Sequence, residues 1–106
     1  MRAGELRHRI TLQKNNPAPN SIGEAVDTWT DLATVWAAIE PLSGNRLFQA
    51  QQANSEIQGV VRIRYRSDVL ATMRIVHIAR YFQVLSIIDT EERHQELHLF
   101  YKELAD

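Results

Sequence analysis

Residues 57–66 read IQGVVRIRYR and form the clearest strand pattern in the chain. Apolar and basic side chains alternate along it, in the order Val61, Arg62, Ile63, Arg64, Tyr65, Arg66. A period of two places successive side chains on opposite faces of a β-strand. We therefore predict a half-buried strand with a core-facing apolar side and an arginine-bearing outer side.

The same alternation recurs on both sides of this stretch. It is seen in residues 7–14 (RHRITLQK), 73–79 (MRIVHIA) and 96–104 (ELHLFYKEL), and each predicts a further strand. Residues 81–89 (YFQVLSIID) are apolar on both faces, which is typical of a central strand. Residues 89–95 (DTEERHQ) are expected to form a charged turn.

Residues 28–42 (TWTDLATVWAAIEPL) also favour a strand, because Trp, Thr, Val and Ile are common in strands. The stretch is too long for one flat strand, so we expect a bend near residues 31–33. A helix is the alternative, since LATVWAAI also fits a helical stripe.

Two stretches lack strand character. Residues 15–25 contain two Pro, three Asn and one Gly, which predicts a surface loop, with residues 15–27 flexible. Residues 43–56 (SGNRLFQAQQANSE) predict a helix of about ten residues with Ser43 as N-cap. Its apolar face is small, so it needs the core or a partner to be stable. The predicted fold class is mainly β: a small closed or partly closed antiparallel β-barrel with one short helix and a long loop insertion.

Composition limits the classes of function. With 106 residues the chain is expected to be one domain, residues 1–106. A net charge of -1 excludes the overall basic excess of many duplex-binding proteins, although a local basic stripe remains possible. The absence of Cys excludes disulfides and zinc–thiolate sites. No apolar run reaches the ~18 residues of a membrane span, and the first residues lack a signal-peptide core, so we expect a soluble intracellular protein.

No constellation of residues points to catalysis. The sequence holds no nucleophile-elbow, P-loop, zincin or dinucleotide-binding motif. His94 and His98 have the spacing of a helical metal pair, but on a strand they would lie about 13 Å apart at ~3.3 Å per residue. His77 has apolar neighbours and is interpreted as a core or edge residue. We expect no enzyme activity, no metal and no cofactor.

Two surfaces are candidates for binding. Arg62, Arg64 and Arg66 would stand ~6.6 Å apart along one strand face, close to the phosphate repeat of a nucleic acid strand. They are interpreted as a salt-bridged surface paired with Glu96 or Asp31, as a protein interface, or as a nucleic-acid contact. Residues 43–56 carry many amide side chains, which suit an adaptable partner surface, a weak DNA contact or an ordinary surface helix.

The order of motifs resembles a known family. The sequence contains RHRITLQ, then Asp27-x-Trp29, VWAAIEPLSGNRLFQAQQ, IRYR, MRI, a strand that starts with Tyr and ends in IID, and a final L-x-L. Over residues 6–103 this resembles the small head–tail joining proteins of long-tailed bacteriophages, also called head-closure or stopper proteins. Asn45 differs from many relatives, which have an acidic residue there, and the loop 15–25 differs as well.

This resemblance implies a structural virion protein at the head–tail junction that assembles in the host bacterial cytoplasm. It implies a β-barrel in a connector ring of about twelve copies that closes the DNA-filled head. A monomer in solution is compatible with this, since such a ring can form only on its template. The implied partners are portal or adaptor ring proteins and tail-terminator or tail proteins, with non-specific contact to packaged DNA and no membrane. Residues 41–57 would project toward the ring channel, and Arg62, Arg64 and Arg66 would face neighbouring subunits or the adaptor ring. The channel or assembly residues are Ser43, Gly44, Asn45, Arg46, Phe48, Gln49, Gln51, Gln52 and Asn54. The alternative function is a small barrel that binds nucleic acid through the three arginines.

Overall fold

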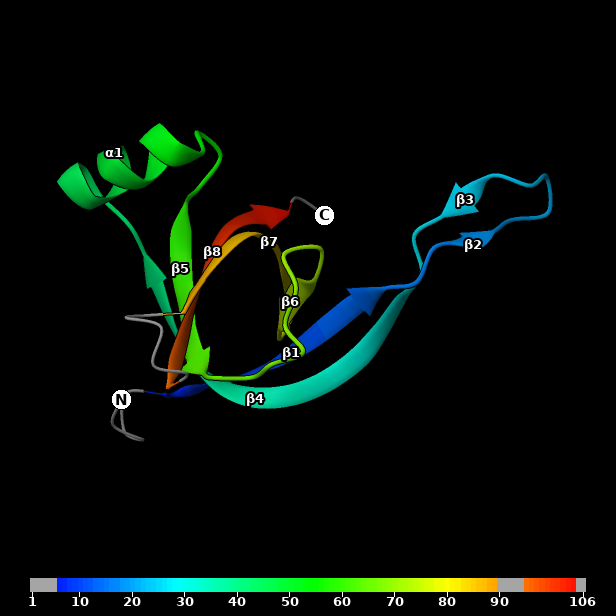
Figure 1. Cartoon of the computed structure of the whole chain (residues 1–106), viewed down its shortest axis with the longest axis horizontal. Coiled ribbons are helices and arrows are strands. Elements are labelled where there is room, and N and C mark those ends of the chain that lie inside the picture. The colour runs from blue at the N-terminus through cyan, green and yellow to red at the C-terminus, as the bar shows by residue number, and fades with distance from the viewer. Residues whose placement is uncertain (1–5, 90–94, 105–106) are drawn as a thin grey trace.

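The computed structural model describes residues 6–89 and 95–104, and their main body is a closed barrel of antiparallel strands (Figure 1). The strands are arranged in the order β1, β4, β5, β8, β7, β6, and β6 closes the barrel by pairing with β1. Their bounds are β1 His8–Asn15, β4 Trp29–Pro41, β5 Gly59–Arg64, β6 Arg74–His77, β7 Arg80–Asp89 and β8 Glu96–Leu104. The predicted fold class, a mainly β antiparallel barrel with one short helix, is confirmed.

The barrel interior is filled by the apolar side chains that the period of two placed on one face. The most deeply buried are Phe82, Ile10, Leu12, Ile63, Ile75, Leu99, Val61 and Val84. The Phe82 ring meets the Tyr101 ring edge to face, with centroids 4.6 Å apart. Gly59 faces the same ring, because a Cβ at this position would lie 2.5 Å from the Tyr101 hydroxyl. Any larger residue at the start of β5 would therefore force the buried Tyr101 ring to move.

Within residues 28–42 the chain forms the strand β4, Trp29–Pro41, and the helical alternative is wrong. Leu12 pairs with Ala33 and Gln13 pairs with Asp31, so Leu32 is an extra residue on β4. This β-bulge lies where the bend was predicted, and bulges bend and twist the strand that carries them. Beyond the bulge, β1 and β4 continue as a two-stranded ladder as far as Asn15 and Trp29.

The ladder ends in an arm, residues 16–28, that projects away from the barrel (Figure 1). Within it, β2 (Ala18–Pro19) pairs antiparallel with β3 (Ala25–Val26). The predicted loop over residues 15–25 therefore contains a short hairpin that the sequence analysis missed. The Pro and Asn residues of this segment favour turns, so the sequence pattern gave no indication of the pairing between β2 and β3. The flexibility predicted for residues 15–27 stays a prediction.

Between β4 and β5 the chain forms α1 (Gly44–Ala53), the predicted helix of ten residues. Ser43 is the N-cap residue, as predicted, but its side chain makes no capping hydrogen bond. Leu47 and Ala50 of α1 pack on a second apolar cluster outside the barrel, formed by Leu42, Ile57 and Val60. The small apolar face of α1 is thus used against the barrel wall.

Strand ends differ from the predictions by one or two residues. The arginine-bearing strand ends at Arg64, so Tyr65 and Arg66 follow it rather than belong to it. The strand predicted over residues 73–79 is limited to Arg74–His77. Residues 90–94, which make up most of the predicted charged turn, lie outside the described residues, and that turn stays a prediction.

Candidate assembly surfaces

One surface is the outer side of α1, which carries most of the predicted channel or assembly residues. Phe48 is 64% exposed, an unusual degree for an aromatic side chain. The other exposed members of the predicted set are Ser43, Gly44, Asn45, Arg46, Gln49 and Gln52. The helix therefore presents amides and one apolar ring to solvent, with Arg46 as the only charged residue between positions 43 and 53.

Gln51 and Asn54 of the same predicted set have roles within the chain. The Gln51 Nε2 donates a hydrogen bond of 3.0 Å to the Ile57 carbonyl oxygen. The Asn54 side-chain oxygen accepts a 2.9 Å hydrogen bond from the Glu56 backbone N–H. These two amides fix the end of α1 and the return of the chain to β5.

A groove of about 510 Å³ runs between α1 and the outer wall of the barrel. Gln49, Ala50 and Ala53 line it from the helix, and Phe100 and Ile88 line it from β8 and β7. The lining also contains charged residues, Glu40, Arg46 and Arg62, which belong to a network of ion pairs.

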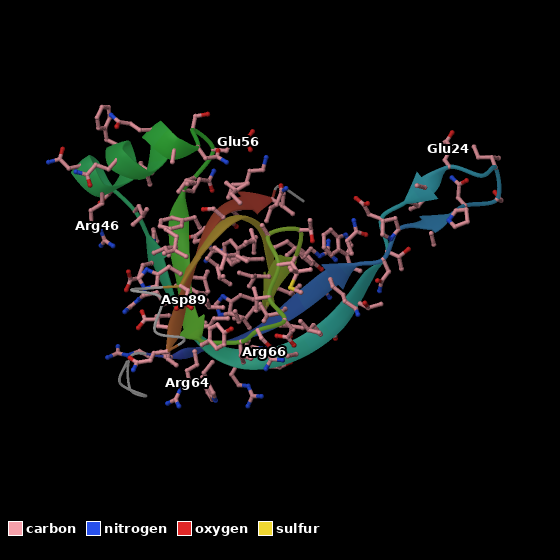
Figure 2. The ribbon with its side chains drawn as sticks, in the orientation of Figure 1. Glu24, Arg46, Glu56, Arg64, Arg66 and Asp89 are labelled. Carbon is pink, nitrogen blue, oxygen red and sulfur yellow. The ribbon has the colours of Figure 1, made fainter. Side chains whose placement is uncertain are left out.

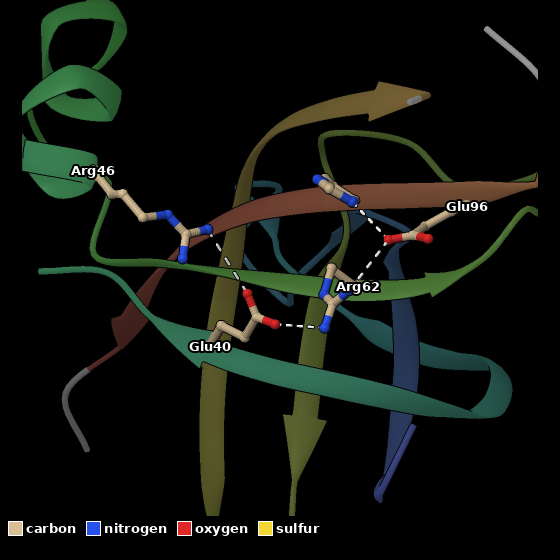
Figure 3. A network of polar contacts seen from close by, with 5 residues as sticks. Glu40, Arg46, Arg62 and Glu96 are labelled. Carbon is tan, nitrogen blue, oxygen red and sulfur yellow. Dashed lines mark hydrogen bonds and ion pairs between the residues drawn. The ribbon is translucent and has the colours of Figure 1, made fainter. Parts of the chain in front are cut away.

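That network is built around Arg62, which lies on the outer face of β5 (Figure 3). Its guanidinium makes an ion pair with Glu40 and a second one of 3.6 Å with Glu96. His98 Nε2 lies 2.7 Å from the same Glu96 carboxylate, and Arg46 lies 3.9 Å from Glu40. The Arg62 side chain is only 22% exposed. For Arg62 the salt-bridged interpretation is confirmed, with Glu96 as one of its predicted partners.

The three arginines of the predicted stripe lie in three different environments. Arg66 follows the strand and makes a forked interaction with Asp68, through Nε–Oδ1 of 3.1 Å and Nη2–Oδ2 of 2.9 Å. These bonds lower the pKa of Asp68 below its usual value. Arg64 is exposed and makes no ion pair within residues 6–89 and 95–104. Asp31, the other predicted partner, accepts a 2.8 Å hydrogen bond from Gln13 instead.

A second surface was not predicted. Arg9 of β1 pairs with Trp36 of β4. The last residue pair of β4 and β5 is Ala37 with Ile63, and the next residue on each strand is Trp36 and Arg64, which line the same groove. The Arg9 guanidinium lies 5.2 Å from the centroid of the Trp36 ring, which is 50% exposed. Arg9, Trp36 and Arg64 come together because of the register between strands. The sequence alone does not show which strands pair, so this surface could not be predicted from it.

Trp36 and Arg64 also line a groove of about 510 Å³. Its lining combines apolar side chains with two arginines: Leu6, Val35, Trp36, Arg64, Tyr65 and Arg66. We call this the basic groove. It suits a ligand with an apolar side chain and a negative charge close together.

The third surface is the tip of the arm. Every residue from 16 to 28 is exposed, including Ile22 at 75% and Val26 at 45%. The Asn20 side-chain oxygen accepts hydrogen bonds from the backbone N–H groups of Ile22 and Glu24, at 3.0 and 2.9 Å. Gly23 has φ +86°, a conformation that glycine adopts without strain. The tip is therefore a turn fixed by hydrogen bonds that exposes Ile22 to solvent.

The histidines give no metal site in the described residues. His98 is held by Glu96, and His77 packs edge to face on His8 with ring centroids 5.0 Å apart. Burial lowers the pKa of His77, and the charges of His8 and Arg80 lower it further. His94 lies outside the described residues. Over residues 6–89 and 95–104, no three metal-ligating side chains gather.

None of the helices in the described part of the chain has the length and apolar character needed to cross a membrane.

Comparison with known proteins identifies the family. The solution structure of a protein from Shigella flexneri 2a has a TM-score of 0.74 and 28% identity, covering 100% of this chain and 99% of that chain. A chain of the virion of a native gene transfer agent particle has a TM-score of 0.65 at 14% identity, covering 95% and 97%, which is a likeness of fold. No curated protein matches the sequence. Residues 1–104 match the family described as phage head completion protein, a match that spans barrel, arm and α1. The predicted resemblance is confirmed, and the chain belongs to this family of structural phage proteins.

Proposed function

We propose that the protein is a connector at the head–tail junction, which closes the DNA-filled head and gives the tail an attachment surface. The family supports a role in completing the head, and the fold likeness to a chain of a gene transfer agent virion agrees with it. The observation that carries the proposal is α1, a helix held on the outside of a closed barrel with its amide-rich side in solvent.

In this proposal the outer side of α1 faces the channel through which DNA passes. Between residues 43 and 53 the chain has one cation and no carboxylate. A strongly basic surface would hold DNA by releasing counterions, whereas a near-neutral amide surface can touch the phosphates without gripping them. Leu47 and Ala50 seat the helix on the barrel, which leaves Phe48, Gln49 and Gln52 for the channel.

In this proposal the protein acts in a closed ring of about twelve copies related by cyclic symmetry. Its partners are the portal or adaptor ring on the head side and tail-terminator or tail proteins on the other. It acts as a structural part of the virion and carries out no reaction.

The test is deletion of the gene from the phage genome, with complementation in trans. We expect the deletion to yield heads without tails that lose DNA, measured by electron microscopy and by nuclease sensitivity of the packaged DNA. The wild-type chain restores tailed particles. Intact tailed particles from the deletion would contradict the proposal.

A charge variant tests the role of α1. Gln49→Lys with Gln52→Lys adds two cations to the exposed side of the helix and should slow DNA release from completed particles. Gln83→Lys is the control, because Gln83 is exposed on β7 and does not belong to α1 or to the lining of the groove beside it. Equal release rates for both variants would argue against α1 as the channel segment.

The alternative, a nucleic-acid-binding module, draws support from the row of Arg9, Trp36 and Arg64, where an aromatic ring lies among cations. It loses support at Arg62 and Arg66, which have carboxylate partners within the chain. Salt-dependent binding of an oligonucleotide by the purified protein, lost on Arg64→Ala, would favour it.

A further inference from the structure

We propose that the arm of one copy of this chain docks by its tip in the basic groove of a neighbouring copy. Ile22 enters beside Trp36, and Glu24 pairs with Arg64. This inference rests on the proposed ring and names the contact that would link its subunits.

The arm is built to make a contact that its own barrel does not supply. Its base is stiffened by hydrogen bonds from Asn16 N–H to the Thr28 carbonyl, 2.7 Å, and from Asn15 to Asp27, 2.9 Å. Asn20 holds the turn at the tip. The arm continues the ladder of β1 and β4 outward and extends away from the barrel, whose strands carry the basic groove (Figure 1). A preorganised element that holds Ile22 in solvent binds at a low entropic cost.

Charge selects the occupant of the groove. From residue 15 to residue 45 the sequence has four carboxylates and no Lys or Arg. The groove has the opposite character, with Arg64 and Arg66 in its lining and Arg9 beside Trp36. Asp68 already holds Arg66, while Arg64 has no ion pair within the described residues. Glu24 and Arg64 are both exposed and lie in different parts of the molecule (Figure 2).

That separation is what a ring needs. A cyclic ring of more than two subunits joins unlike surfaces, so each copy must carry a donor element and a distinct acceptor. The arm and the basic groove satisfy this requirement. The edges of the arm are poor for pairing with another strand, because β2 and β3 have two residues each and β2 ends in Pro19. The contact is therefore made by side chains at the tip.

DNA is the competing occupant of the basic groove. The surface offers one exposed aromatic ring, Trp36, and two exposed arginines, Arg9 and Arg64, without an ion pair in the described chain. Single-strand-binding proteins combine a long basic track with several stacking rings over about four or more nucleotides. The acidic arm is the better match to so small a site.

The first experiment is charge reversal in particles made from the gene deletion by complementation. Glu24→Arg and Arg64→Glu should each lower the yield of complete particles at least about tenfold, the equivalent of ~1.4 kcal/mol, and the double variant should recover most of it. Gln83→Arg is the control for an added surface charge. Both variants change exposed side chains, and circular dichroism of the purified proteins checks that they fold. Normal yields from both single variants, or no recovery in the double variant, would overturn the inference.

The second experiment uses the absence of Cys from the chain. Glu24→Cys/Arg64→Cys should give a ladder of covalent multimers in completed particles treated with a short bis-maleimide, whereas either single variant should not. A cross-link to another virion protein, or none in completed particles, refutes the contact between copies. DNA association that falls with Arg64→Glu and not with Glu24→Arg also refutes it.

If wild-type chain is not needed for head completion, the proposed function fails. If it is needed and these variants behave as wild type, only the arm contact fails.

Discussion

Arg62 and Arg64 provide a matched pair of perturbations, because they lie two residues apart on the same face of β5 and differ in surroundings. Arg62 is 22% exposed and pairs with Glu40 and Glu96. Arg64 is exposed and makes no ion pair within the described residues. Replacing each by Met removes the charge while keeping much of the apolar stem, so the comparison isolates the ion pairs.

The magnitude follows from burial. An exposed ion pair contributes about 0–1 kcal/mol, and removing one partner of a fully buried pair costs about 3–5 kcal/mol. Arg62 lies between these limits. Its loss leaves Glu40 with Arg46 at 3.9 Å and Glu96 with His98 at 2.7 Å, so we expect Arg62→Met to lower the free energy of unfolding by about 2 kcal/mol. For a domain of this size that is a fall in Tm of roughly 8–16 °C. Arg64→Met should stay within about 0.5 kcal/mol of wild type.

The assay is urea unfolding followed by circular dichroism, with both variants and wild type measured at one pH and one salt concentration. Arg62→Met in a Glu96→Gln background serves as a double-mutant cycle, and its cost should be smaller than in wild type because one of the carboxylates is already neutral. Equal costs for Arg62→Met and Arg64→Met would refute the reasoning that the network is part of the fold rather than a free binding surface.

Two further predictions concern the barrel. Gly59→Ala should destabilise it by about 1–3 kcal/mol, because the new methyl would overlap the Tyr101 ring, and an unchanged urea midpoint would contradict this account. Lowering the pH from about 7.5 to about 5.5 should lower the Tm, because burial, with the charges of His8 and Arg80, holds the pKa of His77 below 6.5. The unfolded chain then takes up the proton first, so the stability present above the unfolded pKa is lost as the pH falls. His77→Phe should flatten the dependence, and an unchanged slope would exclude His77 as its source.

The elements that could be predicted are those whose signal is local. Leu97 and Leu99 face the core because a strand alternates, and α1 begins after Ser43 because its composition changes there. The bend in β4 was predicted from length alone and corresponds to Leu32, the bulged residue. None of these inferences needed to know which strand lies beside which.

What could not be predicted depends on pairing between distant segments. Glu40 reaches Arg62 because β4 pairs with β5, whereas the sequence offered Glu96 and Asp31 as partners. Trp36 comes beside Arg64 for the same reason. The hairpin of the arm could not be predicted, because β2 and β3 have two residues each and lie between turn-forming residues, so they show no periodicity.

Closure of the barrel explains why the candidate contacts are at its appendages. An open sheet offers free N–H and C=O groups that can pair with another chain, and a closed barrel has none along its wall. β6 closes the barrel by pairing with Thr11, Leu12 and Gln13 of β1. Side chains and elements that leave the wall are therefore the candidates for contacts between neighbouring copies. The arm and α1 are the two such elements in the described residues, and each carries an exposed apolar side chain, Ile22 or Phe48. In a ring these elements would divide the work, with the arm joining subunits and α1 meeting the DNA. Loss of the arm contact should then prevent assembly, whereas charge on α1 should alter DNA release from rings that still form.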